Sequence, residues 1–98
     1  MDIEKQKDGK KLDIKLTGRL DTKGAPELME VINDYLDGVE ELTLDLSDLI
    51  YVSSAGLRVI LSAQKIMNKQ GAMKITHVQD IVMEVFESTG FVDILTIE

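Results

Sequence analysis

The sequence predicts a single α/β domain over residues 1–98, with a mixed, mostly parallel sheet covered mainly on one face by amphipathic helices. Two observations predict this class. Strand-like and helix-like segments follow the order ββαβαβαβ, so that strands and helices alternate after Gly18. Each helix-like segment carries one apolar stripe and so has one face to bury. A chain of 98 residues, 44% of them hydrophobic, has the length for one core and not for two.

The first expected element is a β-hairpin. Residues 3–7 and 12–16 alternate in polarity around a glycine-containing turn at 8–10. Gly18 is expected to break the second strand. Apolar residues two positions apart share one face of that strand, and we expect them to lie in the core: Leu12, Ile14 and Leu16.

An amphipathic helix is expected over residues 24–37. Asp21 or Thr22 caps its N-terminus, and Pro26 is tolerated because it lies in the first turn. Gly38 lies near its C-terminal end. Apolar residues recur at helical spacing on one face and beyond its end: Ala25, Leu28, Met29, Ile32, Tyr35, Leu36 and Val39.

The remaining segments continue the alternation. A third strand at 42–46 runs into a short loop, which leads to a second helix expected at about 54–68 and closed by Gly71. Its apolar stripe comprises Leu57, Ile60, Leu61 and Met67, widened by Val59, Ala63 and Ile66. The last elements are a strand at 73–78, a helix marked by Ile81, Val82, Val85 and Phe86 and ended by Gly90, and a short strand at 93–97. Strands that alternate with helices imply right-handed crossovers onto a mostly parallel sheet.

Composition excludes several classes of function. The net charge of −7 disfavours nucleic acids and anionic membranes as partners. The absence of cysteine removes disulfides and thiolate metal sites. The chain starts without the basic and apolar regions of a signal peptide, and its longest apolar run, 49–52, is far short of the ~20 residues that span a bilayer. We therefore expect a cytoplasmic protein with no membrane insertion.

Ser53 and Ser54 open the second helix, where backbone N–H groups are unpaired and the helix macrodipole is positive. The structural interpretation is plain N-capping, which needs one serine. A functional interpretation is favoured by the second serine and by the small residues Ala55 and Gly56, which leave the first turn bare for the approach of another protein. Arg58, one turn on, could pair with an added phosphate or with an acidic partner side chain.

No catalytic, metal or cofactor site is predicted. His77 is the only histidine and stands at the end of an apolar strand, where a structural role is expected. The G-x-S-x-G elbow, the dinucleotide fingerprint and the phosphate-binding P-loop are all absent, and the acidic residues are scattered. Residues 62–65 match S-x-x-K by letter but lie in the middle of a helix, so we interpret the match as coincidence.

Three short motifs carry a family resemblance: Gly18-Arg19-Leu20-Asp21, Asp45-Leu46-Ser47 and Ser53-Ser54-Ala55-Gly56-Leu57. In this order they resemble the signature of STAS domains, above all the bacterial anti-sigma-factor antagonists. The expected elements match that family along nearly the whole chain, so the resemblance implies a STAS-like fold. The sequence departs from the family pattern at Ser53, where aspartate is common, and at Ala55, where serine is common.

The resemblance also implies a function. With the glycines in register, the phospho-acceptor falls on Ser54, and Ser53 is the runner-up. The implied partners are a serine-kinase anti-sigma factor, which binds the unphosphorylated protein and is released on phosphorylation, and a serine phosphatase; no cofactor is implied. The loop that holds Asp21 would lie beside the serine loop and help to shape the kinase-binding surface, whose expected residues are Asp21, Thr22, Tyr51, Val52, Ser53, Ala55, Gly56 and Arg58.

Two alternatives stay open at this point. The first is a stand-alone STAS subunit of a lipid-transport or stress-signalling assembly, which need not be phosphorylated. The second, from another class, is a weak nucleotide-binding or nucleotide-hydrolysing enzyme, disfavoured because no phosphate loop or general base can be named. A neighbouring gene for a histidine-kinase-like ATPase would favour the antagonist, and neighbouring transporter genes would favour the first alternative.

Overall fold

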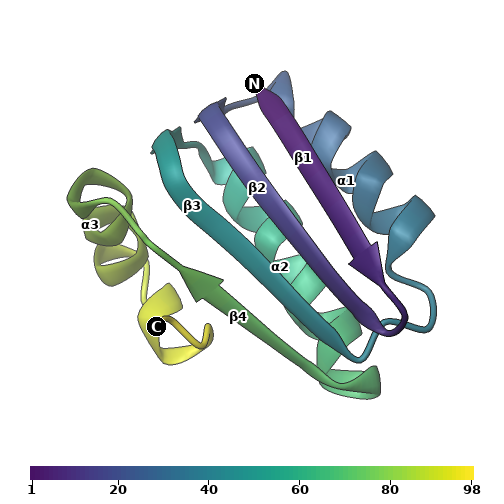
Figure 1. The fold of residues 1–98 in the computed structure, drawn as a ribbon. Coiled ribbons are helices and arrows are strands. Elements are labelled where there is room, and N and C mark those ends of the chain that lie inside the picture. Colours follow the sequence, from purple (N-terminus) through teal and green to yellow (C-terminus); the bar gives the residue numbers. More distant parts are fainter.

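A four-stranded sheet lies at the centre of the structure, a computed structural model that describes residues 1–98 (Figure 1). The elements in chain order are β1 (Asp2–Asp8), β2 (Lys11–Leu20), α1 (Gly24–Tyr35), β3 (Glu41–Val52), α2 (Ser54–Gln70), β4 (Ala72–Thr76), α3 (Asp80–Ser88) and a 3-10 helix (Phe91–Asp93). The strand order is β1-β2-β3-β4; β1 and β2 are antiparallel, and β2, β3 and β4 are parallel. The predicted α/β class and mostly parallel sheet are confirmed.

Helices α1 and α2 cover one face of the sheet. Each of them connects a strand to the next parallel strand in the same direction across the sheet, and right-handed crossovers then place both on one side. Figure 1 shows α1 and α2 behind the sheet and α3 beside its β4 edge, while the near face is uncovered. The expectation of helices mainly on one face is confirmed. None of the helices combines the length and the apolar character needed to cross a lipid bilayer.

The face of the sheet toward the helices is the core. The inward side chains of β2 are Leu12, Ile14, Leu16 and Leu20, all at most 1% exposed. The inward side chains of β3 are Leu42, Leu44, Leu46, Leu49 and Val52. They are two residues apart as far as Leu46 and three apart afterwards. Two register shifts against β2 explain the change, because each adds one residue to β3 and so keeps the same face buried.

Both central strands are longer than predicted. Gly18 was expected to break β2, but the strand continues to Leu20, and Gly18 takes φ +102 where the register with β3 shifts. The short loop expected after residue 46 does not form either, because β3 continues through both bulges to Val52. A strand is predicted from side chains that alternate every two residues, and the bulges break this alternation. The predicted strand therefore ended at residue 46, too early.

Asp45 stabilises the first bulge of β3. Its Oδ1 accepts the backbone N–H of Ser47 at 2.9 Å and lies 3.5 Å from Nδ1 of His77, just after β4. Partial burial raises the pKa of Asp45, but the hydrogen bonds from Ser47 and the charges of His77 and Lys15 outweigh it, so the pKa lies below its usual value. The folded protein therefore favours the ionised carboxylate.

The C-terminal segment differs from the prediction. Residues 93–97 were expected to form a fifth strand, but Phe91–Asp93 is a 3-10 helix, and only Ile97 bridges to the sheet, opposite Ile75. The chain reaches the β4 edge through two hydrogen bonds alone, from Ile75 N–H to the Thr96 carbonyl and from Glu98 N–H to the Ile75 carbonyl, both 2.9 Å long. A smaller difference concerns Leu61, which was assigned to the core stripe of α2 but is only half-buried.

The first turn of α2 packs tightly against the end of β2. A Cβ added to Gly56 would lie 2.7 Å from Cγ of Leu20 and 2.8 Å from its carbonyl oxygen. Real Cβ atoms do not approach backbone so closely, and the backbone of Leu20 is fixed in the sheet by its pairing with Val52. Only glycine allows the helix to start at this position.

Replacing Gly56 with alanine should therefore destabilise the domain. Alanine improves helix propensity by about 1 kcal/mol, but we expect the clash with Leu20 to leave a net loss of about 1–3 kcal/mol. Urea and thermal unfolding measure this loss. Lys65→Ala, at an exposed position of the same helix, is the control for propensity and should be nearly neutral. A Gly56→Ala protein as stable as wild type would contradict the close packing.

The lowered pKa of Asp45 predicts a pH dependence of stability. Its contribution is present above the unfolded pKa, near 3.8, and is lost as the pH falls through the lower folded pKa. The difference in free energy of unfolding between wild type and Asp45→Asn should thus be largest near neutral pH and shrink toward about pH 3. Urea titrations across this range measure it, with Asp13→Asn on the same face as control. A difference independent of pH would rule out this role for Asp45.

Candidate functional site

One residue separates β3 from α2 and caps the helix. Ser53 is extended (φ −92, ψ 173), and its Oγ accepts the backbone N–H of Gly56 at 3.2 Å. Its carbonyl oxygen accepts the N–H of Leu57 at 2.9 Å and starts the helical ladder. The capping role considered for the serine pair thus belongs to Ser53.

Ser54 is the first residue of α2, and its side chain is exposed. No hydrogen bond is formed by its hydroxyl, whereas that of Ser53 is occupied. The first turn carries no acidic residue, so the positive end of the helix dipole is not offset there. Chemically, the arrangement offers a free hydroxyl at a position that accommodates negative charge.

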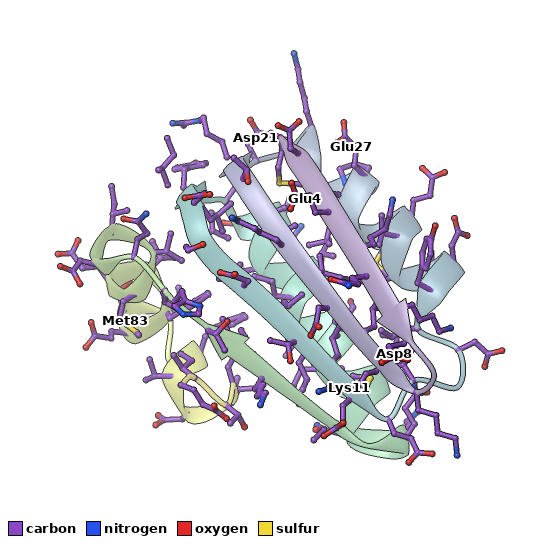
Figure 2. All side chains as sticks on the ribbon, in the orientation of Figure 1. Glu4, Asp8, Lys11, Asp21, Glu27 and Met83 are labelled. Atoms are coloured by element: carbon purple, nitrogen blue, oxygen red, sulfur yellow. The ribbon has the colours of Figure 1, made fainter.

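The loop that holds Asp21 lies beside the serines, as the resemblance implied. The carbonyl of Leu20 accepts the N–H of Ser53 at 2.9 Å, which ties the two loops together. Asp21 Oδ1 accepts the N–H groups of Gly24 at 2.9 Å and of Lys23 at 3.0 Å. The hydrogen bond from Gly24 is the largest cause that lowers the pKa of this carboxyl. Asp21 therefore holds the turn that leads into α1, whose N-cap residue is Lys23, and lies next to the exposed Thr22. Figure 2 shows Asp21 at the same end of the sheet as Glu27.

An exposed cation–π pair flanks the serines on the sheet side. The guanidinium of Arg19 lies 4.2 Å from the ring centroid of Tyr51, its neighbour in the β2–β3 register. Tyr51 is 38% exposed and the preceding Ile50 is 51% exposed, because the second bulge of β3 turns both outward. Tyr51 was predicted as a contact residue, whereas Arg19 and Ile50 were not, since their exposed positions depend on the bulge.

The other predicted contact residues divide into surface and interior. Arg58 is exposed and Ala55 half-buried, so both can be touched from outside. Val52 is 4% exposed, and Gly56 is buried against Leu20. These two residues support the surface from beneath. The bare first turn was interpreted as room for a partner, but the missing side chain of Gly56 makes room for Leu20.

His77 lies at the first bulge of β3 and makes no hydrogen bond with the residues of the serine junction. It follows β4, has φ +57, and faces Asp45. This placement agrees with its interpretation as a strand-end residue, because it follows the last residue of β4 and contacts Asp45 at the first bulge of β3.

Comparisons with known proteins agree with this geometry. The family model described as Mlab, STAS domain matches residues 3–96. The anti-sigma-B factor antagonist of Listeria monocytogenes is 31% identical over 97 residues, which cover 96% of this chain and 84% of the relative.

Two solved structures are also similar. The anti-sigma factor antagonist SpoIIAA in its unphosphorylated form superposes with a TM-score of 0.86 at 16% identity, over 99% of this chain and 88% of that one. The Bacillus cell fate determinant SpoIIAA in the phosphorylated form gives 0.77 at 15% identity, over 99% and 91%. At such identities these structures show the fold alone. The matches in sequence establish that the chain belongs to the STAS-domain family of the anti-sigma factor antagonists.

Proposed function

We propose that this chain is an anti-sigma factor antagonist that works as a phosphorylation-controlled interaction switch. The unphosphorylated protein binds a serine-kinase anti-sigma factor and so frees a sigma factor. Phosphorylation of Ser54 by that kinase releases the protein, and a serine phosphatase resets it. In this role the chain is a cytoplasmic substrate and binding partner rather than an enzyme, and it needs no cofactor.

The observation that carries the proposal is that the two serine hydroxyls have different surroundings. Ser53 uses its hydroxyl to cap α2, whereas Ser54 presents a free hydroxyl to solvent. The γ-phosphoryl group of ATP would pass to Ser54 Oγ, with the hydroxyl proton going to a base on the kinase and ADP leaving. The cap on Ser53 would remain in place, so the modification would not disturb the start of the helix.

Energetics indicate how phosphorylation would cause release. A phosphoserine adds about −1.5 to −2 charges, and the helix dipole favours it by only ~0.3–1 kcal/mol. A hundredfold loss of affinity requires about 2.8 kcal/mol. The dipole effect is therefore too small and has the wrong sign. Release must come from the burial of a strongly hydrated phosphate in the contact or from repulsion by partner carboxylates.

The proposed contact surface surrounds Ser54. It comprises the exposed or half-exposed residues Asp21, Thr22, Tyr51, Ala55 and Arg58, to which we add the exposed neighbours Arg19 and Ile50. Ser53, Val52 and Gly56 hold the surface in shape. An aromatic ring stacked with an arginine is typical of the residues that contribute most to protein interfaces.

The family model that matches residues 3–96 favours one second candidate. The matching model is described as Mlab, STAS domain, and not as an antagonist. A stand-alone STAS subunit of a lipid-transport or stress-signalling assembly is therefore the alternative proposal. Co-purification with transporter subunits, and no phosphate on Ser54 in cells by mass spectrometry, would favour it over the antagonist.

The identity of the acceptor is testable with two alanine variants. Ser54→Ala should abolish incorporation of phosphate by the serine-kinase anti-sigma factor and ATP, measured by intact-mass spectrometry. Ser53→Ala should keep incorporation but lose about 0.5–2 kcal/mol of stability with its cap. Full incorporation into Ser54→Ala would move the acceptor elsewhere.

The mechanism of release is testable without phosphorylation. Ser54→Asp should bind the kinase about tenfold more weakly than wild type, equivalent to ~1.4 kcal/mol, because a carboxylate supplies part of the phosphate charge. Ser54→Ala should bind like wild type and resist release by ATP, and Ser54→Asn serves as the uncharged control. Calorimetry measures the affinities, and all three variants should melt within about 4 °C of wild type. Wild-type affinity of Ser54→Asp, or its unfolding, would contradict this account.

A further inference from the structure

Charge is distributed unequally among the three helices. Helices α1 and α3 each carry three acidic residues and no basic one, whereas α2 carries three basic residues and no acidic one. This helix stands out in a protein whose net charge is −7. We call its basic residues the cationic stripe: Arg58, Lys65 and Lys69.

The cationic stripe and Ser54 lie on one face of α2. At 3.6 residues per turn, spacings of four, seven and four from Ser54 onward return to the same side of a helix. All four residues are exposed, and the buried residues of α2 lie on the opposite side. At 1.5 Å per residue the face extends about 22 Å from Ser54 to Lys69.

The charges of this stripe are not compensated within the protein. Lys10 and Lys15 form ion pairs with carboxylates, but no stripe residue has a carboxylate within 4.0 Å. The half-buried Leu61 lies on the same face and is not packed against the core. The outer face of α2 thus combines free cations with an apolar side chain, as is typical of a surface that meets a partner.

We propose that the outer face of α2 docks onto an acidic surface of the protein partner. The identity of that partner and the role of Ser54 rest on the proposed function. An acidic protein patch about as long as α2 fits better than nucleic acid, because a long polyanion would also meet the acidic residues of the adjacent α1, which are Glu27, Glu30 and Asp34. Association would be steered by charge and weakened by salt.

This docking accounts for the direction of the switch. Ser54 occupies the N-terminal end of the same face, one turn before Arg58. A phosphate there would add about −1.5 to −2 charges and offset much of the positive charge of the stripe. The partner's carboxylates nearest Ser54 would then be repelled, and those along the stripe would be attracted less strongly. Phosphorylation would thereby lower affinity without any change of fold.

The test compares two sets of charge reversals. The stripe variant carries Arg58→Glu, Lys65→Glu and Lys69→Glu, and a milder version carries glutamine at the same positions. The matched control carries Lys5→Glu, Lys11→Glu and Lys74→Glu on three strands, with the same change in net charge. Circular dichroism verifies folding, and stopped-flow kinetics measure association with the purified serine-kinase anti-sigma factor of the same genome.

We expect the stripe reversal to slow association by about tenfold or more at low salt, and the glutamine version by about threefold. The strand control should change the rate less than about twofold. Added salt should slow wild type toward the rate of the glutamine version. Equal slowing by stripe and control variants would show an effect of net charge alone and overturn the proposal, as would a stripe variant that associates like wild type.

A second arm separates this inference from the proposed function. If the wild-type protein binds no serine-kinase anti-sigma factor, the proposed function fails, and a helical peptide with glutamates on one face then serves as the probe. Shifts of ¹⁵N-labelled amides confined to residues 54–69 would support docking on α2, and unchanged spectra would overturn it. Stripe-dependent binding of duplex DNA or phosphatidylserine vesicles, or stripe-dependent self-association in sedimentation, would overturn the choice of partner.

Discussion

The contact between the end of β2 and the first turn of α2 determines the geometry of the candidate site. The carbonyl of Leu20 accepts the N–H of Ser53, and the side chain of Leu20 fills the space that a Cβ on Gly56 would need. Arg19 and Asp21 flank Leu20 in the sequence. The same contact therefore brings Asp21 and Arg19 beside the serines, although the two segments are more than thirty residues apart.

The bulges of β3 adapt a regular sheet to this contact. Each adds one residue to the strand while Leu46, Leu49 and Val52 remain in the core. Without them the strand would have to expose part of its leucine face or end early. The second bulge also turns Ile50 and Tyr51 to the surface. An irregularity that preserves the core thus supplies the exposed apolar area beside Ser54.

Separate residues cap the helix and present a free hydroxyl at the start of α2. Ser53 satisfies a backbone donor of the first turn, so the helix does not depend on the hydroxyl of Ser54. A negative charge added to Ser54 meets the positive end of the helix dipole and the cationic outer face of α2. Under the proposed function, such a change would alter how the surface attracts a partner far more than it would alter the free energy of folding. This separation suits a reversible switch in a small domain with little stability to spare.

The α/β class, the hairpin and the helix that begins at Ser54 were predictable from the sequence, because hydrophobic period and capping residues are local signals. The serine junction was predictable for the same reason. The extension of β3, the inward position of Gly56 and the pairing of Arg19 with Tyr51 were not, since they depend on the register between strands distant in the chain. The prediction of a fifth strand was wrong, because local alternation does not reveal whether the segment can pair along an edge of the sheet. Packing of distant segments sets register and exposure, and those set which side chains a partner can touch.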